Sequence, residues 1–157
     1  DFTNDSPLTY ARSNKMMGFI NSKGEWVIQP QYEKVRAFNQ GLTPVYKDKN
    51  WGYIDEKGNT VIDLKYKDAE IFADNGLAPV KEKKLWGFVD KSGNLVIPMD
   101  YDISIGMFGF LQKGSEKGFQ DGLARVKKDK KWGFIDEKGR VLGQWHDNAE
   151  VFVDTSK

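Results

Sequence analysis

The stretch Trp51-Gly52-Tyr53-Ile54-Asp55-Glu56-Lys57-Gly58-Asn59-Thr60-Val61-Ile62 decides the fold. Residues 55–58 have the composition of a type I turn in which Gly58 takes a positive φ, so they predict a hairpin with a bulge. This turn joins a strand at residues 51–55 to a second strand at residues 59–62. Gly52, inside the first strand, permits the close approach of a neighbouring backbone or ring, or a bulge.

The pattern recurs three more times along the chain. The other copies begin at Met17-Gly18, Trp86-Gly87 and Trp132-Gly133. Their glycines lie 34, 35 and 46 residues apart (52−18, 87−52 and 133−87), so the last step holds about 11 extra residues. After most copies come a turn glycine, an apolar pair, a tyrosine and a phenylalanine. A period of this length indicates a repeat protein in which neighbouring copies share a core.

We therefore expect an all-β fold of tandem repeats. Each repeat should form a three-stranded antiparallel meander, followed by a tyrosine-to-phenylalanine crossing segment that could hold a short helical turn. The predicted array is open or gently twisted, because the insertion and a shortened fourth copy break exact symmetry; a closed propeller- or barrel-like ring is the alternative. We expect one domain, residues 1–157, with a half unit at 1–14 and units at 15–50, 51–85, 86–131 and 132–157.

Charge and composition exclude several kinds of partner. With 24 basic and 23 acidic side chains the net charge is +1, so we expect no nucleic-acid partner. No apolar stretch is long enough to span a membrane as a helix, and we expect no membrane insertion. The chain has no cysteine, which excludes disulfides, thiolate metal sites and cysteine nucleophiles. Residues 1–14 do not have the pattern of a signal peptide.

No pattern of catalytic residues is present in the sequence. There is no nucleophile elbow around a serine, no histidine and acid cluster with metal-ligand spacing, and no glycine-rich loop that opens a helix. His146, the single histidine, replaces the tyrosine of the other copies, which favours packing over catalysis. We therefore expect no enzymatic activity, no cofactor and no metal site.

The recurring marks are aromatic-Gly-Phe-Ile-Asp, Lys-Gly, Val-Ile-Pro, a tyrosine, a phenylalanine and Gly-Leu-Ala. Together they resemble the WG β-repeat family of bacterial proteins, over nearly the whole chain from Phe2 to Phe152. The resemblance implies export to the periplasm, the cell surface or the medium, and a scaffold or binding role without catalytic residues. The chain departs from the family pattern at Met17, at Asp63, in the insertion and at residues 143–146, and we expect function at such departures.

The insertion, residues 103–118, holds the first candidate site. Its apolar side chains lie among glycines, and an adaptable apolar patch suits a protein or peptide partner. The alternative is an added edge hairpin that packs on the array. The candidate binding residues are Met107, Phe108, Phe110 and Leu111.

The tryptophans fall into two groups. Trp51, Trp86 and Trp132 recur at equivalent places, which favours core packing over sugar stacking. Trp26 and Trp145 have no aromatic equivalent in the other copies, so a role in sugar or peptide stacking competes there with simple packing.

Lysine-rich turns recur at residues 47–49, 81–84 and 127–131. If the repeats stack, these lysines form a ridge that suits a polyanion, although lysines at such turns more often keep strand edges from pairing. The favoured function is a non-catalytic binding scaffold for a protein or peptide. A carbohydrate- or cell-wall-binding module that uses Trp26 and Trp145 is the alternative.

Overall fold

The computed structural model describes residues 7–102, 119 and 122–146. The described residues form fourteen β-strands and no helix. The strands are β1 (Thr9–Ser13), β2 (Met16–Ile20), β3 (Trp26–Tyr32), β4 (Lys34–Val35), β5 (Leu42–Lys47), β6 (Asn50–Asp55), β7 (Thr60–Tyr66), β8 (Asp68–Ala69), β9 (Ala78–Glu82), β10 (Leu85–Val89), β11 (Leu95–Tyr101), β12 (Leu123–Lys128), β13 (Lys131–Asp136) and β14 (Val141–His146).

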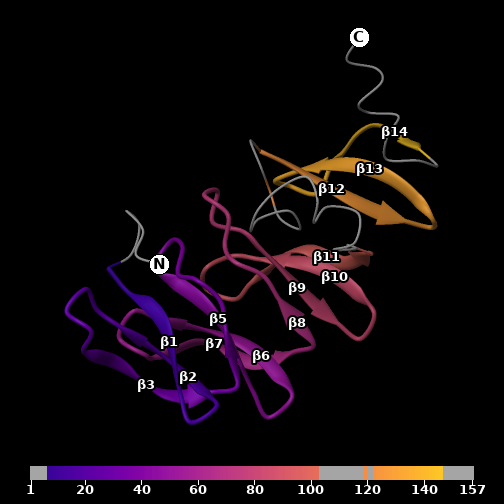
Figure 1. Cartoon of the computed structure of the whole chain (residues 1–157). Helices are drawn as coiled ribbons and strands as arrows, with labels where there is room; N and C mark the ends of the chain where they lie inside the picture. Colours follow the sequence, from indigo (N-terminus) through magenta and orange to yellow (C-terminus); the bar gives the residue numbers. More distant parts are fainter. Residues whose placement is uncertain (1–6, 103–118, 120–121, 147–157) are drawn as a thin grey trace.

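Four small antiparallel sheets follow one another in chain order (Figure 1). The first sheet holds β1 to β3, the second β4 to β7, the third β8 to β11 and the fourth β12 to β14. In Figure 1 the sheets form a row, with the indigo first sheet and the orange-to-yellow fourth sheet at opposite ends. The described residues therefore form an open all-β array, as the sequence predicts, and no closed barrel.

The crossing segments differ from the expectation. Those described hold no helical turn; instead β4 and β8 are short strands that pair with the next strand along the chain. This pairing satisfies backbone groups that would otherwise lie beside the core without partners. The second and third sheets therefore have four strands rather than three, and the boundaries between sheets fall at the crossing segments, inside the repeats.

The glycine of each aromatic-Gly pair faces a bulge in the following strand. In the second sheet the register skips residues 63–65, so that all three face Gly52. A Cβ on Gly52 would lie 2.6 Å from the carbonyl oxygen of Ile62, which leaves no room for a side chain. The predicted close approach and bulge are both confirmed. The corresponding glycines that face the same bulge are Gly18, Gly87 and Gly133.

A smaller bulge follows the turn in the first three sheets. The register skips Val61 in the second sheet, as it skips Val27 in the first and Val96 in the third. The fourth sheet lacks this bulge, because Val141 and Leu142 pair with consecutive residues of β13. The one-residue shortening of the fourth repeat thus removes a bulge and leaves the hairpin intact.

The side chain of the first residue of each turn accepts hydrogen bonds from backbone N–H groups of the same turn. In the second sheet the backbone N–H groups of Lys57 and Asn59 donate to Asp55 Oδ1 at 3.0 and 2.8 Å. Gly58 takes the expected positive φ of 88°. The equivalent acceptors in the other three sheets are Asn21, Asp90 and Asp136.

The buried hydrophobic side chains of the described residues form three clusters, one between each pair of adjacent sheets. In each cluster a phenylalanine from a crossing segment meets the aromatic residue that follows the strand glycine, with ring centroids 4.7 to 4.9 Å apart. Such ring pairs contribute about 0.5–1.5 kcal/mol beyond the area they bury. The expectation that neighbouring copies share a core is confirmed. The ring pairs are Phe19 with Phe38, Tyr53 with Phe72 and Phe88 with Phe119.

A second repeated contact joins neighbouring sheets. The isoleucine after one turn packs on the turn glycine of the next sheet, and a Cβ on Gly58 would lie 3.4 Å from Cγ1 of Ile28. The residues that repeat this contact are Ile62 with Gly93 and Ile97 with Gly139. These isoleucines are buried, whereas Leu142, at the equivalent position of the fourth sheet, is 41% exposed.

Candidate binding surface

The structure describes only some of the residues predicted to bind. Met107, Phe108, Phe110 and Leu111 lie outside the described residues, so the role of the insertion stays a prediction. Trp26 lies on β3 and is 36% exposed, so part of its ring is open to solvent.

Trp145 on β14 packs against its surroundings. A Cβ on Gly133 would meet the Trp145 ring at 2.7 Å, and this ring stacks on Tyr101 with centroids 6.3 Å apart. Trp145 also packs on the core between the third and fourth sheets. Its ring fills the space that bulged backbone occupies over the corresponding glycines of the other sheets, which favours a packing role.

The recurring tryptophans are buried. Trp51, Trp86 and Trp132 are 6%, 3% and 4% exposed, which confirms the predicted core packing. Cations lie over the Trp51 and Trp132 rings: Arg36 lies 4.7 Å from the Trp51 centroid and Lys127 lies 5.6 Å from the Trp132 centroid. Each of these two rings therefore packs beneath a basic side chain.

A cleft of about 550 Å³ opens between the first and second sheets, and we name it the first cleft. Side chains of β1 and β2 line one wall, while residues 33–36, β5 and β6 line the other, together with Lys67 and Asp68 from the start of the third sheet. Its aromatic lining includes Tyr10, which is 48% exposed. Its charged lining residues are Arg12, Glu33, Lys34, Arg36, Lys67 and Asp68.

The first cleft carries an excess of positive charge. Four basic and two acidic side chains line it, which gives a net charge of +2 (4 − 2). Arg36 is fixed within it, because its Nε donates to the carbonyl oxygen of Ala69 at 2.9 Å and its Nη2 lies 3.3 Å from Asp68 Oδ1. The carboxylate of Glu33 accepts a hydrogen bond from the backbone N–H of Asp48 at 2.9 Å.

The other three cations of the first cleft are exposed. Arg12, Lys34 and Lys67 make no ion pair within 4.0 Å of another residue in the part of the chain that the structure describes. The ammonium group of Lys34 lies 5.1 Å from the centroid of the Tyr46 ring, which borders the same cleft. The first cleft therefore presents three exposed cations that are not engaged in close ion pairs among the described residues.

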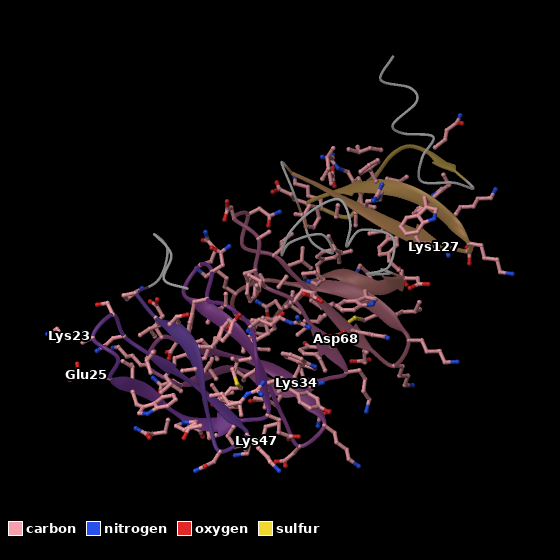
Figure 2. All side chains as sticks on the ribbon, in the orientation of Figure 1. Lys23, Glu25, Lys34, Lys47, Asp68 and Lys127 are labelled. Atoms are coloured by element: carbon pink, nitrogen blue, oxygen red, sulfur yellow. The ribbon has the colours of Figure 1, made fainter. Side chains whose placement is uncertain are left out.

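A second cleft, of about 360 Å³, lies between the third and fourth sheets. Three lysines and three aspartates line it, so its net charge is 0 (3 − 3). Figure 2 shows Lys47, Lys34, Asp68 and Lys127 along one side of the row, with Asp68 between Lys34 and Lys127. Acidic side chains therefore stand among the lysines of the second cleft, and of the two clefts only the first has a positive excess. The charged residues of the second cleft are Asp100, Asp102, Lys127, Lys128, Asp129 and Lys130.

The charge of the first cleft comes from positions at which the copies differ. Lys34 pairs with β5 as Asp68 pairs with β9, so the two residues are equivalent. The N–H groups of Arg36 and Glu70 donate to equivalent proline carbonyls, so these two residues also correspond. A basic pair in one copy is therefore an acidic pair in the next. The sequence contains this signal, because the equivalent segments 32–38 and 66–72 align without a gap, and the strand pairing confirms which residues correspond.

A buried polar contact lies beside Arg36. The hydroxyl of Tyr53 donates to the backbone carbonyl of Glu70 at 2.7 Å. Burial raises the pKa of Tyr53 well above its usual value, the charge of Glu70 raises it further, and Arg36 lowers it. Tyr53 is therefore a neutral hydrogen-bond donor that holds the second sheet to the third.

Within the described ranges, no group of three or more histidine, cysteine, aspartate or glutamate residues is placed to hold a metal ion. No helix in that part of the chain is both long and apolar enough to cross a membrane.

The sequence pattern described as "WG containing repeat" matches residues 17–51, 51–86, 86–108 and 117–132. The chain belongs to this family. Three of the matches begin at Met17, Trp51 and Trp86, on β2, β6 and β10, whereas the fourth ends at Trp132 and so covers β12 and only the start of β13.

Solved structures of similar fold share little sequence with this WG-repeat chain. A structure described as "KlHsv2 with loop 6CD replaced by a Gly-Ser linker" is 12% identical, with a TM-score of 0.52 over 95% of this chain and 51% of that one. A second, described as "Crystal structure of the eukaryotic initiation factor", is 12% identical, with a TM-score of 0.46 over 82% and 36%. The chain thus spans about half of the length of the first structure, and less than half of the length of the second. No curated protein matches the WG-repeat chain.

Proposed function

We propose that this chain is a non-catalytic binding scaffold that recognises a protein or a peptide. One observation carries the proposal. The aromatic and aliphatic residues that recur in the repeats are buried between the sheets, while residues at which the copies differ in charge line clefts at the surface. In repeat proteins such a division lets one kind of core support a varied binding face. The WG repeats supply the framework, and the differing positions supply recognition.

Deletion of residues 106–117 tests the contribution of the insertion. The full chain, used as bait in an extract of the organism that produces it, should retain a protein partner that is then purified and titrated. The deletion variant should lose at least tenfold in affinity for that partner, because insertions carry recognition in scaffolds of this type. Unchanged affinity in a deletion variant with an unaltered unfolding temperature would remove the insertion from the binding site.

A carbohydrate-binding module is the second candidate, and the partly exposed ring of Trp26 supports it. Aromatic rings open to solvent offer flat faces for sugar stacking. Trp26→Ala should then abolish retention on cell-wall polysaccharide without a change in unfolding temperature. Trp145→Ala is the contrasting variant, because loss of its ring opens space above Gly133 and lowers stability. Failure of the unmodified chain to bind polysaccharide would end this alternative.

We further propose that the chain belongs to an exported or surface-exposed bacterial protein. The resemblance of its repeats to the WG family supports this location. Fractionation of the producing cells, followed by detection with an antibody, should find the protein in the periplasm, at the surface or in the medium. Recovery from the cytoplasm alone would contradict the proposal.

A further inference from the structure

We propose that the first cleft binds an acidic peptide segment whose carboxylates contact Arg12, Lys34 and Lys67. This inference rests on the proposed function, because it names the partner chemistry and the site of the same scaffold. The volume of the cleft, about 550 Å³, lies within the range of about 300–1,000 Å³ that is usual for ligand sites.

Charge complementarity is the first support for an acidic ligand. The three cations come from different places in the chain: Arg12 lies on β1, Lys34 on β4 and Lys67 directly after β7. They converge on one cleft and share no acidic partner within ion-pair distance among the described residues. A single exposed ion pair contributes little, so three convergent cations favour a ligand with several carboxylates.

The fixed groups of the first cleft give it a defined shape. Arg36 is clamped between the Trp51 ring and the acceptors of the third sheet, and Glu33 is engaged with the backbone of Asp48. The two acidic groups of the lining, Glu33 and Asp68, therefore already have hydrogen-bond partners. A ligand meets a preorganised wall, and less side-chain freedom is lost on binding.

The chemistry of the surroundings favours a peptide over a long polyanion. The second cleft along the row is neutral, and the whole chain carries a net charge of only +1, so an extended polyanion meets one basic site without a continuous track. The rings of Tyr10 and Tyr46 give the first cleft apolar surface that suits aliphatic side chains. An extended peptide with alternating acidic and aliphatic residues presents its carboxylates on one side and its apolar groups on the other.

Fluorescence anisotropy with a defined probe tests this site. The probe is a short fluorescein-labelled peptide of alternating glutamate and leucine, and the comparison peptide has glutamine in place of glutamate. The unmodified chain should bind the glutamate peptide at least tenfold more tightly, and added salt should weaken this binding, because exposed charges are screened. Lys34→Glu with Lys67→Glu should lower the affinity for the glutamate peptide at least tenfold.

A matched double variant separates local from overall charge. Lys128→Glu with Lys130→Glu in the second cleft changes the net charge by the same amount, and it should alter the affinity less than twofold. Equal losses in the two double variants, equal binding of the two peptides, or tighter binding of a heparin oligosaccharide would overturn the proposal. Binding of neither peptide would also overturn it. The wider scaffold proposal is tested separately, by the titration of the purified protein partner against the full chain and the 106–117 deletion variant.

Discussion

At the scale of single residues, the two members of the aromatic-Gly pair have separate structural tasks. The side chains of Trp51, Trp86 and Trp132 pack into the inter-sheet cores, while the glycine leaves space for the group that lies above it. Over Gly52 that neighbour is backbone, whereas over Gly133 it is the ring of Trp145. The same residue type thus meets two different obstacles, and these obstacles differ in how easily they move.

This difference predicts unequal costs for the same substitution. In Gly52→Ala the new methyl group would lie 2.6 Å from the Ile62 carbonyl oxygen, so two strands must separate, and we expect a loss of about 3 kcal/mol in the free energy of unfolding. Gly133→Ala should cost about 1 kcal/mol, because the Trp145 ring is able to tilt away. Urea unfolding of both variants measures the losses. A similar loss in both would show that the bulged backbone is not the obstacle.

The lowered pKa values of the turn aspartates predict that acid destabilises the fold. Slight burial raises the pKa of Asp55 and of Asp90, but backbone N–H donors, first those of Asn59 and Asn94, outweigh it and hold both pKa values below their usual range. The backbone N–H of Arg140 is the largest cause of the lowered pKa of Asp136. Because the folded-state pKa values are depressed, the stabilisation is present above about pH 4 and is lost as the pH falls through the folded values.

The first sheet supplies the variant that tests this acid sensitivity. Asn21 accepts the same two backbone hydrogen bonds with a neutral side chain. Asp55→Asn, Asp90→Asn and Asp136→Asn together should therefore keep the fold and flatten the decline of the unfolding temperature between neutral and acid pH. Thermal unfolding followed by circular dichroism across this range gives the comparison. A decline as steep as that of the unmodified chain would mean that other carboxylates cause it.

At the scale of elements, the crossing segments link neighbouring sheets with polar bonds as well as with rings. Between the second and third sheets, Asn39 Nδ2 donates to the carbonyl oxygen of Phe72 at 2.7 Å, and Arg36 donates to that of Ala69. The residue equivalent to Asn39 in the next copy is Ala73. The bond made by the Asn39 side chain therefore has no counterpart at Ala73, and the repeat pattern does not require it.

Asn39→Ala should isolate the contribution of this polar link. The backbone position tolerates alanine, since Ala73 occupies it in the next copy, so the main loss is the hydrogen bond to Phe72. We expect the free energy of unfolding to fall by about 1 kcal/mol. Asn94→Ala, which removes an amide that bonds within its own exposed turn, is the control and should cost less. A larger loss in the control would assign the stability to turns and not to the interface.

The sequence predicts the hairpins of the repeats better than it predicts the residues that meet in the surface clefts. The spacing of glycines and apolar pairs locates the hairpins, because turn chemistry and burial act within about ten residues of each other. The short strands β4 and β8 were missed, since two residues of Lys34–Val35 or Asp68–Ala69 carry no periodicity. The first cleft was missed for a further reason: Arg12, Lys34 and Lys67 come from three different copies, and only the stacking of sheets brings them together.

At the scale of the whole molecule, stability is distributed along a row. Each core lies between two adjacent sheets, so the second and third sheets take part in two cores, and the first and fourth take part in one among the described residues. Chains of this kind behave as a series of units coupled to their nearest neighbours. The free energy needed to open a sheet locally should therefore depend on its place in the row.

Native-state hydrogen exchange measures this gradient. Amides of β5, β6, β9 and β10 should exchange more slowly than those of β1 to β3 and β12 to β14, because opening a middle sheet disrupts two cores and opening an end sheet disrupts one. Mass spectrometry of peptic fragments provides the necessary resolution. Uniform protection of all four sheets would instead indicate a single cooperative unit.

The contact between an isoleucine and the turn glycine of the next sheet has an evolutionary consequence. Ile28, Ile62 and Ile97 all meet a turn glycine, so this contact has the same form at each of the three junctions. A duplication of one intact unit would insert a sheet that matches both of its new neighbours at once. Such a gene lengthens in whole steps without compensating mutations, and each new copy is then free to diverge at its exposed charges.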